Sequence, residues 1–123
     1  MKIFVMLGAG LMFLGVGLGA FGAHALSDYF EANPDLAEIF DTAVRYHMIH
    51  AVSLLGVAWV GSEWPGSLVT AAGWLIFAGI LIFSGSLYLL VMTNTRWLGA
   101  ITPIGGVAFL AGWVCLLVGV WQG

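Results

Sequence analysis

Residues 67–92 read SLVTAAGWLIFAGILIFSGSLYLLVM, a run without a single charged side chain. A helix that crosses the hydrocarbon of a bilayer needs about 20 apolar residues, so this run is long enough to span it with some tilt. Comparable apolar stretches occupy residues 3–25, 43–61 and 103–121, and only short polar breaks separate them. The sequence therefore predicts four membrane-spanning helices.

The overall composition agrees with a chain that is solvated by lipid. Hydrophobic residues make up 62% of its 123 residues and charged residues 7%, which is too little polar surface to cover a soluble fold. We expect one membrane domain over residues 1–123, an all-α, antiparallel four-helix bundle with short connections. Three basic residues against six acidic ones leave no basic surface for nucleic acid.

The first apolar stretch has some features of a signal peptide. Lys2 precedes it, and Ala23-His24-Ala25 resembles a cleavage site of small residues. The stretch from Ile3 to Ala25 is, however, longer than the core of a signal peptide, which has about 7–15 apolar residues. We therefore treat it as a retained span.

Two Pro residues mark the starts of helices. Asn33 ahead of Pro34 has the pattern of a cap residue and a first helical position, and Thr102 ahead of Pro103 repeats it at the fourth span. The helix from Pro34 is predicted to run on into the second span. We expect Asn33 and Thr102 to be the cap residues of these helices.

The helix that contains the second span begins outside the hydrocarbon. From Pro34 to Gly61 it covers about 42 Å at about 1.5 Å per residue, so its first two turns form an amphipathic extension. Asp41 lies four residues before Arg45, the order that favours an ion pair on one helix face. Arg45 is therefore predicted to lie at the membrane boundary with a partner.

Glycines recur along the first and fourth spans. Those that we predict to pack helices together are Gly15, Gly19, Gly22, Gly105 and Gly112. Gly15 and Gly19 form a GxxxG pair, which allows two helix backbones to approach closely. The contacts lie within the chain or between copies. A water-filled pathway would need polar lining residues, which these stripes lack.

The antiparallel topology gathers the polar residues of the spans at one end of the bundle. The ligand-binding candidates are His24, Arg45, Tyr46, His47, His50, Ser84, Ser86, Tyr88 and Thr102. Counting the rise per residue, His50 and Ser86 both lie about 10 Å inside the boundary, close enough in depth to face each other. Polar groups at such depth cost free energy unless they are paired, so the cluster is a site hypothesis.

Three interpretations of the cluster remain open. In the first, the polar groups hydrogen-bond across helices and fix the bundle. In the second, they bind or transport a small polar ligand or ion, with help from Arg45 and the start of the fourth span. In the third, His24, His47 and His50 bind a metal or haem, although no carboxylate or thiol accompanies them at depth. We predict no metal and no cofactor.

A catalytic site has less support. An activated Ser84 or Ser86 would require His50 beside it, a third orienting group and an oxyanion site. The sequence offers no candidate for the last two, so we predict that the protein is not an enzyme.

Four segments, in order along the chain, resemble one known family. They are GAFGAHAL (19–26), TAVRYHMIHA (42–51), FSGSLY (83–88) and TPIGG (102–106). They resemble the small bacterial membrane proteins grouped as domain of unknown function 423, which are related to transmembrane protein 256 of eukaryotes. The resemblance covers essentially the whole chain. It implies a four-span protein of the inner (plasma) membrane, without an established activity, and it adds Pro103 to the motif residues.

We therefore expect a multi-pass protein of the bacterial inner membrane with a structural or accessory role. It would contact the lipid bilayer and form a homo-oligomer or join a larger membrane complex through its glycine faces. The alternative is a small-ligand or ion-binding protein, or a transporter, that uses the polar cluster. A transporter would lose flux on replacement of Arg45 or His50, whereas an accessory protein would lose its partner on Gly→Leu changes at Gly15, Gly19 or Gly112.

Overall fold

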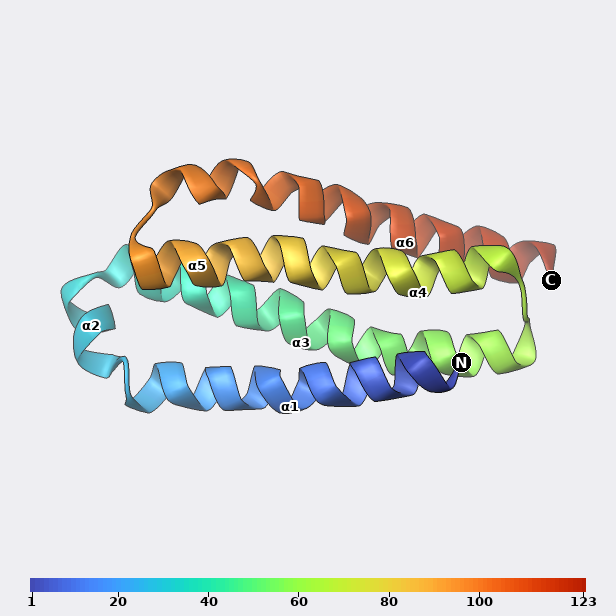
Figure 1. Cartoon of the computed structure of the whole chain (residues 1–123), viewed down its shortest axis with the longest axis horizontal. Helices are drawn as coiled ribbons and strands as arrows, with labels where there is room; N and C mark the ends of the chain where they lie inside the picture. The colour runs from blue at the N-terminus through green and yellow to red at the C-terminus, as the bar shows by residue number, and fades with distance from the viewer.

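The computed structural model describes residues 1–123 and is built of helices alone. Four long helical segments run antiparallel, with both chain termini at one end of the bundle (Figure 1). The segments are α1 (Lys2–His24), α3 (Pro34–Glu63), α4 with α5 (Ser67–Gly79 and Gly85–Thr93) and α6 (Thr102–Gln122). Each belongs to a helical stretch that is long and apolar enough to cross a membrane. The predicted all-α, four-span bundle is confirmed.

α3 starts where the sequence predicts. Asn33 is its cap residue and Pro34 occupies the first helical position, and the Asn33 carbonyl accepts hydrogen bonds from the N–H groups of Leu36 and Ala37. The Asn33 side chain turns the other way and donates from Nδ2 to the Tyr29 carbonyl, at 2.9 Å. The side chain therefore satisfies the end of the preceding helix and makes no capping hydrogen bond to α3.

Two short helices close the end of the bundle away from the termini. The first, α2 (Ser27–Ala32), was not predicted; its Tyr29 hydroxyl donates to the Val91 carbonyl near the end of α5, at 2.8 Å. The second, the 3₁₀-helix η2 (Arg96–Ala100), brings Arg96 to 2.7 Å from Asp35 in the first turn of α3. Through these contacts α2 is attached to the end of α5, and η2 to the start of α3.

The Asp35–Arg96 pair lies outside the spans and predicts a pH dependence of stability. The hydrogen bond from Arg96 lowers the pKa of Asp35 below its ordinary value of 3.8. Since the folded pKa is the lower one, the stabilisation is present above pH 3.8 and is lost as the pH falls through the folded pKa. We expect Asp35→Asn to lower the melting temperature slightly at neutral pH, with the difference vanishing on acidification.

The measurement is thermal unfolding in detergent across this pH range at low and high salt. Both carboxylate and guanidinium are solvent-exposed, so salt should shrink the effect. Glu31→Gln is the control, since Glu31 makes no ion pair. A melting difference between Asp35→Asn and the natural chain that persists in strong acid would contradict the assignment.

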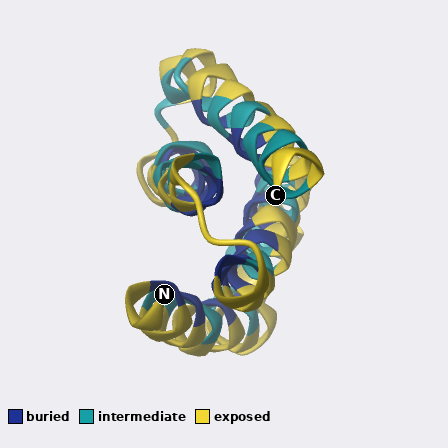
Figure 2. Ribbon diagram, turned by 90° about the vertical axis from the view of Figure 1, so that its right-hand side faces the viewer, coloured by how far each residue is buried: buried dark blue, intermediate teal, exposed yellow.

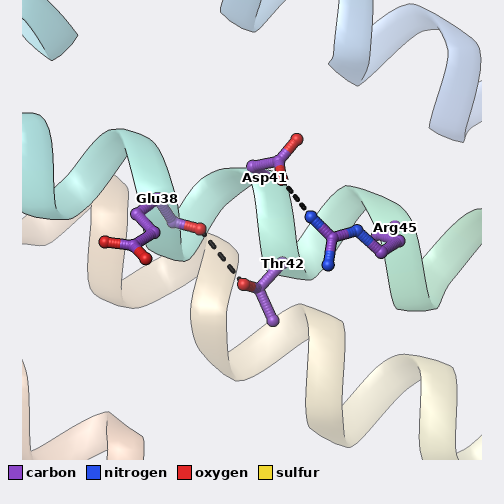
Figure 3. A network of polar contacts seen from close by, with 4 residues as sticks. All are labelled: Glu38, Asp41, Thr42 and Arg45. Carbon is purple, nitrogen blue, oxygen red and sulfur yellow. Dashed lines mark hydrogen bonds and ion pairs between the residues drawn. The ribbon is translucent and has the colours of Figure 1, made fainter.

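The extension of α3 carries the ion pair that its sequence predicts. Arg45 lies one turn after Asp41 and reaches back to it, with 2.6 Å between Nη2 and Oδ2 (Figure 3). On the same helix the Thr42 hydroxyl donates to the Glu38 carbonyl, at 3.1 Å. The predicted ion pair of Arg45 is confirmed, and the guanidinium is occupied at the helix surface.

The third span contains a wide turn that the sequence did not predict. Between α4 and α5, residues Ile80–Ser84 form a π-helix, η1. Its Phe83 backbone lies directly against Gly105 of α6, where a Cβ atom would overlap the Phe83 nitrogen. Short π-helical turns within α-helices are rare and often mark functional positions. Here the turn coincides with a close backbone approach to α6.

The helices are arranged with α3 and the α4–α5 segment in the middle. α1 packs mainly against α3, and α6 mainly against α4 and η1. In the apolar segment of each of the first and last helical stretches, only 17% of the residues are buried, against 39% and 44% in the two middle stretches. Figure 2 shows the buried residues where the helices face one another and the exposed ones outside. α1 and α6 are thus the peripheral helices of the bundle.

The predicted packing glycines contact helices of their own chain. Gly15 and Gly22 in α1 lie against Met48 and Phe40 of α3, and Gly112 in α6 lies against Ile76 of α4. Of the remaining two, Gly105 meets Phe83 as described above, and Gly19 is in ordinary contact with Val44. These faces are therefore filled within one chain.

Candidate functional site

His47 connects three helices through both of its ring nitrogens. The side chain is 3% exposed, and Nε2 lies 2.7 Å from the Leu11 carbonyl of α1. A carbonyl only accepts, so Nε2 carries the proton. Nδ1 lies 2.7 Å from the Tyr88 hydroxyl of α5, which donates to it in the neutral ring. His47 is therefore held as the Nε2–H tautomer.

His50, one turn further along α3, is held as the opposite tautomer. Its Nδ1 donates to the Tyr46 carbonyl at 2.9 Å, and its Nε2 accepts from the Trp113 indole N–H of α6 at 3.0 Å. The ring stacks on Phe109, with centroids 3.6 Å apart. A charged ring would turn two N–H donors toward each other at Trp113. This arrangement thus holds His50 neutral.

The serines make two further links between helices. The Ser84 hydroxyl, in η1, donates to the Ala43 carbonyl of α3 at 2.8 Å. Ser86 of α5 and Thr102 of α6 share a hydrogen bond of 2.7 Å. Thr102 makes no capping hydrogen bond. The predicted cap at Thr102 is therefore wrong, because its hydroxyl is used between helices.

The remaining candidates lie outside this network of links. His24 is exposed at the end of α1, where only its carbonyl accepts a hydrogen bond, from Ser27. Arg45 is exposed and paired with Asp41. Tyr46 is 39% exposed, and its ring packs on Phe83. The nine candidates do not converge on a single cavity, and His50 lies level with Phe109 and Trp113 in the middle of α6, not with Thr102 at its start.

The histidines are not arranged around a common metal position. His47 lies beside Gly15, whereas His24 is two and a half turns further along α1, about 13 Å at about 1.5 Å per residue. All four ring nitrogens of His47 and His50 are already within hydrogen-bonding distance of other groups. No group of three or more His, Cys, Asp or Glu side chains has a geometry suited to a metal ion.

A groove runs along the outside of the bundle between α3 and α6. Near the polar end it forms a hollow of about 460 Å³, with Tyr46, His50 and Trp113 among its lining residues. Further along, a second hollow of about 490 Å³ lies between Val60 and the last turns of α6. Trp113 lines both hollows.

Sequence reasoning missed Phe109 and Trp113, the two α6 residues that contact His50. Both look like ordinary apolar residues of a span. The available signal was the indole N–H, because a Trp in the middle of a span requires a hydrogen-bond acceptor. His50 is the acceptor that it finds.

The chain is similar to named bacterial membrane proteins over nearly its whole length. UPF0382 membrane protein YwdK of Bacillus subtilis is 51% identical over 120 residues, which cover 96% of this chain and 95% of that protein. UPF0382 membrane protein SSP2132 of Staphylococcus saprophyticus is 43% identical over 122 residues and 99% of both chains. No solved structure matches the chain.

The family comparison agrees with the sequence motifs. The family described as protein of unknown function, DUF423, matches residues 18–106. This range contains the four segments on which the resemblance was based, and the resemblance is confirmed. With four apolar helices and relatives named as membrane proteins, this chain is an integral membrane protein that belongs to the DUF423 family.

Proposed function

We propose that this protein is a structural or accessory component of the bacterial plasma membrane, which works by associating with itself or with a larger membrane complex. The observation that carries the proposal is that the polar side chains within the bundle bind one another. No buried side-chain nitrogen or oxygen lacks a hydrogen-bond partner. Such groups hold helices together, and each of them is already paired within the chain.

The energetics support the same role. Hydrogen bonds between membrane helices contribute about 0.6–2 kcal/mol each. His47, His50, Ser84 and Ser86 together join α3 to α1, α5, α6 and η1, and α5 to α6. A transport pathway would instead need polar groups that exchange partners with the passing ligand. We likewise propose that the protein is not an enzyme.

Association would use the outward faces of the peripheral helices. Gly15, Gly22, Gly105 and Gly112 are already packed inside the chain, so changing them would damage the fold before it affected an interface. The lipid-facing sides of α1 and α6 carry large side chains, among them Phe13 and Val114, which are 79% and 58% exposed. These sides are the surface available to a partner.

The test is native mass spectrometry of the protein extracted gently from its own membrane. We expect a homo-oligomer or a complex with another membrane protein. A strictly monomeric protein without a protein partner would contradict the proposal.

The alternative is a small-ligand or ion-binding protein, or a transporter, and it has its own readout. In proteoliposomes we expect no flux of protons or potassium above that of empty vesicles. A flux that His50→Phe abolishes while the protein remains folded would replace the accessory role with a transporter.

A further inference from the structure

We propose that the groove between α3 and α6 holds a hydrocarbon chain of a phospholipid, with the lipid head group beside Tyr46. The groove consists of the two hollows described above, which meet at Trp113. The inference goes beyond the proposed function, since lipid binding here depends on neither self-association nor a protein partner.

The groove exists because α6 packs against α4 and η1 and makes few contacts with α3. α3 and α6 meet chiefly where Phe109 stacks on His50 and Trp113 donates to it. These two side chains reach across the gap between the helices and form the floor of the groove. Both ring nitrogens of His50 are already hydrogen-bonded, so the floor of the groove offers mainly the faces of aromatic rings to a ligand.

The size of the groove suits a flexible chain. The hollows measure about 490 and 460 Å³, and each falls in the range of small-molecule sites, about 300–1,000 Å³. A spanning helix about 30 Å long and 10 Å wide fills roughly 2,400 Å³. A partner helix would therefore stay largely outside the groove, whereas a lipid chain fits within it.

The polarity along the groove matches an amphiphile. Tyr46 lines one end, next in sequence to the boundary residue Arg45; it is 39% exposed and its hydroxyl makes no hydrogen bond within the chain. Towards the other end the lining includes Leu116 and Val120, and all six residues of the second hollow are hydrophobic. From Pro103 to Trp121 the groove follows α6 for about 27 Å, nearly the roughly 30 Å of the two leaflets together, so a lipid chain whose head group lies beside Tyr46 occupies the half of the groove nearest that end.

Gly106 offers a direct test, because it lines the groove at a point with free space. A Cβ atom at Gly106 would meet only Phe83 Cδ2, at 3.9 Å. Gly106→Leu therefore places a side chain in the groove without a backbone clash. The matched control is Gly10→Leu, since Gly10 is an exposed glycine of α1 with nothing within 4 Å of a Cβ.

The experiment is native mass spectrometry of the detergent-solubilised protein, titrated with a phosphatidylcholine that carries a palmitoyl and an oleoyl chain. We expect the natural chain and Gly10→Leu to retain one lipid under conditions that strip the others. Gly106→Leu should weaken this binding about tenfold or more, equivalent to about 1.4 kcal/mol. Tyr46→Phe should weaken it several-fold through loss of the head-group hydrogen bond.

Equal lipid retention by Gly106→Leu and the natural chain would overturn the proposal. A lipid-free dimer that Gly106→Leu dissociates would also overturn it and make a second copy the occupant. Circular dichroism establishes whether each variant is folded. If Gly106→Leu does not fold, Val107→Trp takes its place in the test, since it fills the same hollow from another position. The same spectra report the oligomeric state, so loss of lipid with an unchanged oligomer leaves the proposed function standing.

Discussion

Gly105→Ala is expected to destabilise the bundle by about 1–3 kcal/mol or more, a cost typical of adding a methyl group to a closely packed interior. A Cβ atom at this position would overlap the backbone nitrogen and Cα of Phe83 in the π-helix. Backbone atoms cannot rotate away as a side chain can, so α6 and η1 would have to separate. Thermal unfolding in detergent, followed by circular dichroism, measures the effect.

The neighbouring glycine supplies the control. Gly106→Ala meets only Phe83 Cδ2 at 3.9 Å and gains the higher helix propensity of alanine, up to about 1 kcal/mol. We expect it to be neutral or slightly stabilising. Equal melting temperatures for the two variants would show that η1 and α6 are not in close backbone contact.

His47→Leu is expected to cost about 1–4 kcal/mol, since it removes two hydrogen bonds between helices, each worth about 0.6–2 kcal/mol. The partners are the Leu11 carbonyl and the Tyr88 hydroxyl. The unfolding free energy in a detergent titration is the quantity to compare. His24→Leu is the matched control, because the His24 side chain is exposed and makes no hydrogen bond.

A double-mutant cycle separates the hydrogen bond from the loss of the ring. Tyr88→Phe alone should destabilise the protein by leaving His47 Nδ1 without a donor. In the His47→Leu background the same change should cost little, because its partner is already gone. If the two changes were additive, His47 and Tyr88 would not be coupled.

Much of the fold was predictable because lipid imposes strong rules on sequence. The length of each apolar stretch predicts a span, and the spacing of Asp41 and Arg45 predicts their ion pair. The π-helix at Ile80–Ser84 was not predictable, since it coincides with a tertiary contact, that between Phe83 and Gly105. Nor was the position of the Asn33 amide, which had a competing acceptor at Tyr29.

The candidate site was predictable as a set of polar residues but not in depth or pairing. Counting residues from the boundary predicted that His50 and Ser86 lie at the same depth, and this prediction is wrong. Ser86 meets Thr102 at the start of α6, whereas His50 meets Phe109 and Trp113, about 10–17 Å further along that helix. Both depth and direction depend on how the helices slide and rotate against one another, which the sequence of one span does not specify.

The central position of α3 and α4–α5 also sets an order of assembly during synthesis. α1 enters the bilayer before α3 exists, so its glycine face is covered by lipid until Met48 and Phe40 arrive. α6 comes last and docks on a hairpin that is already in place. We therefore expect the hairpin of residues 34–93 to be the part on which α1 and α6 dock from either side, so that α1 still docks in a chain lacking α6 but not in a chain lacking α3.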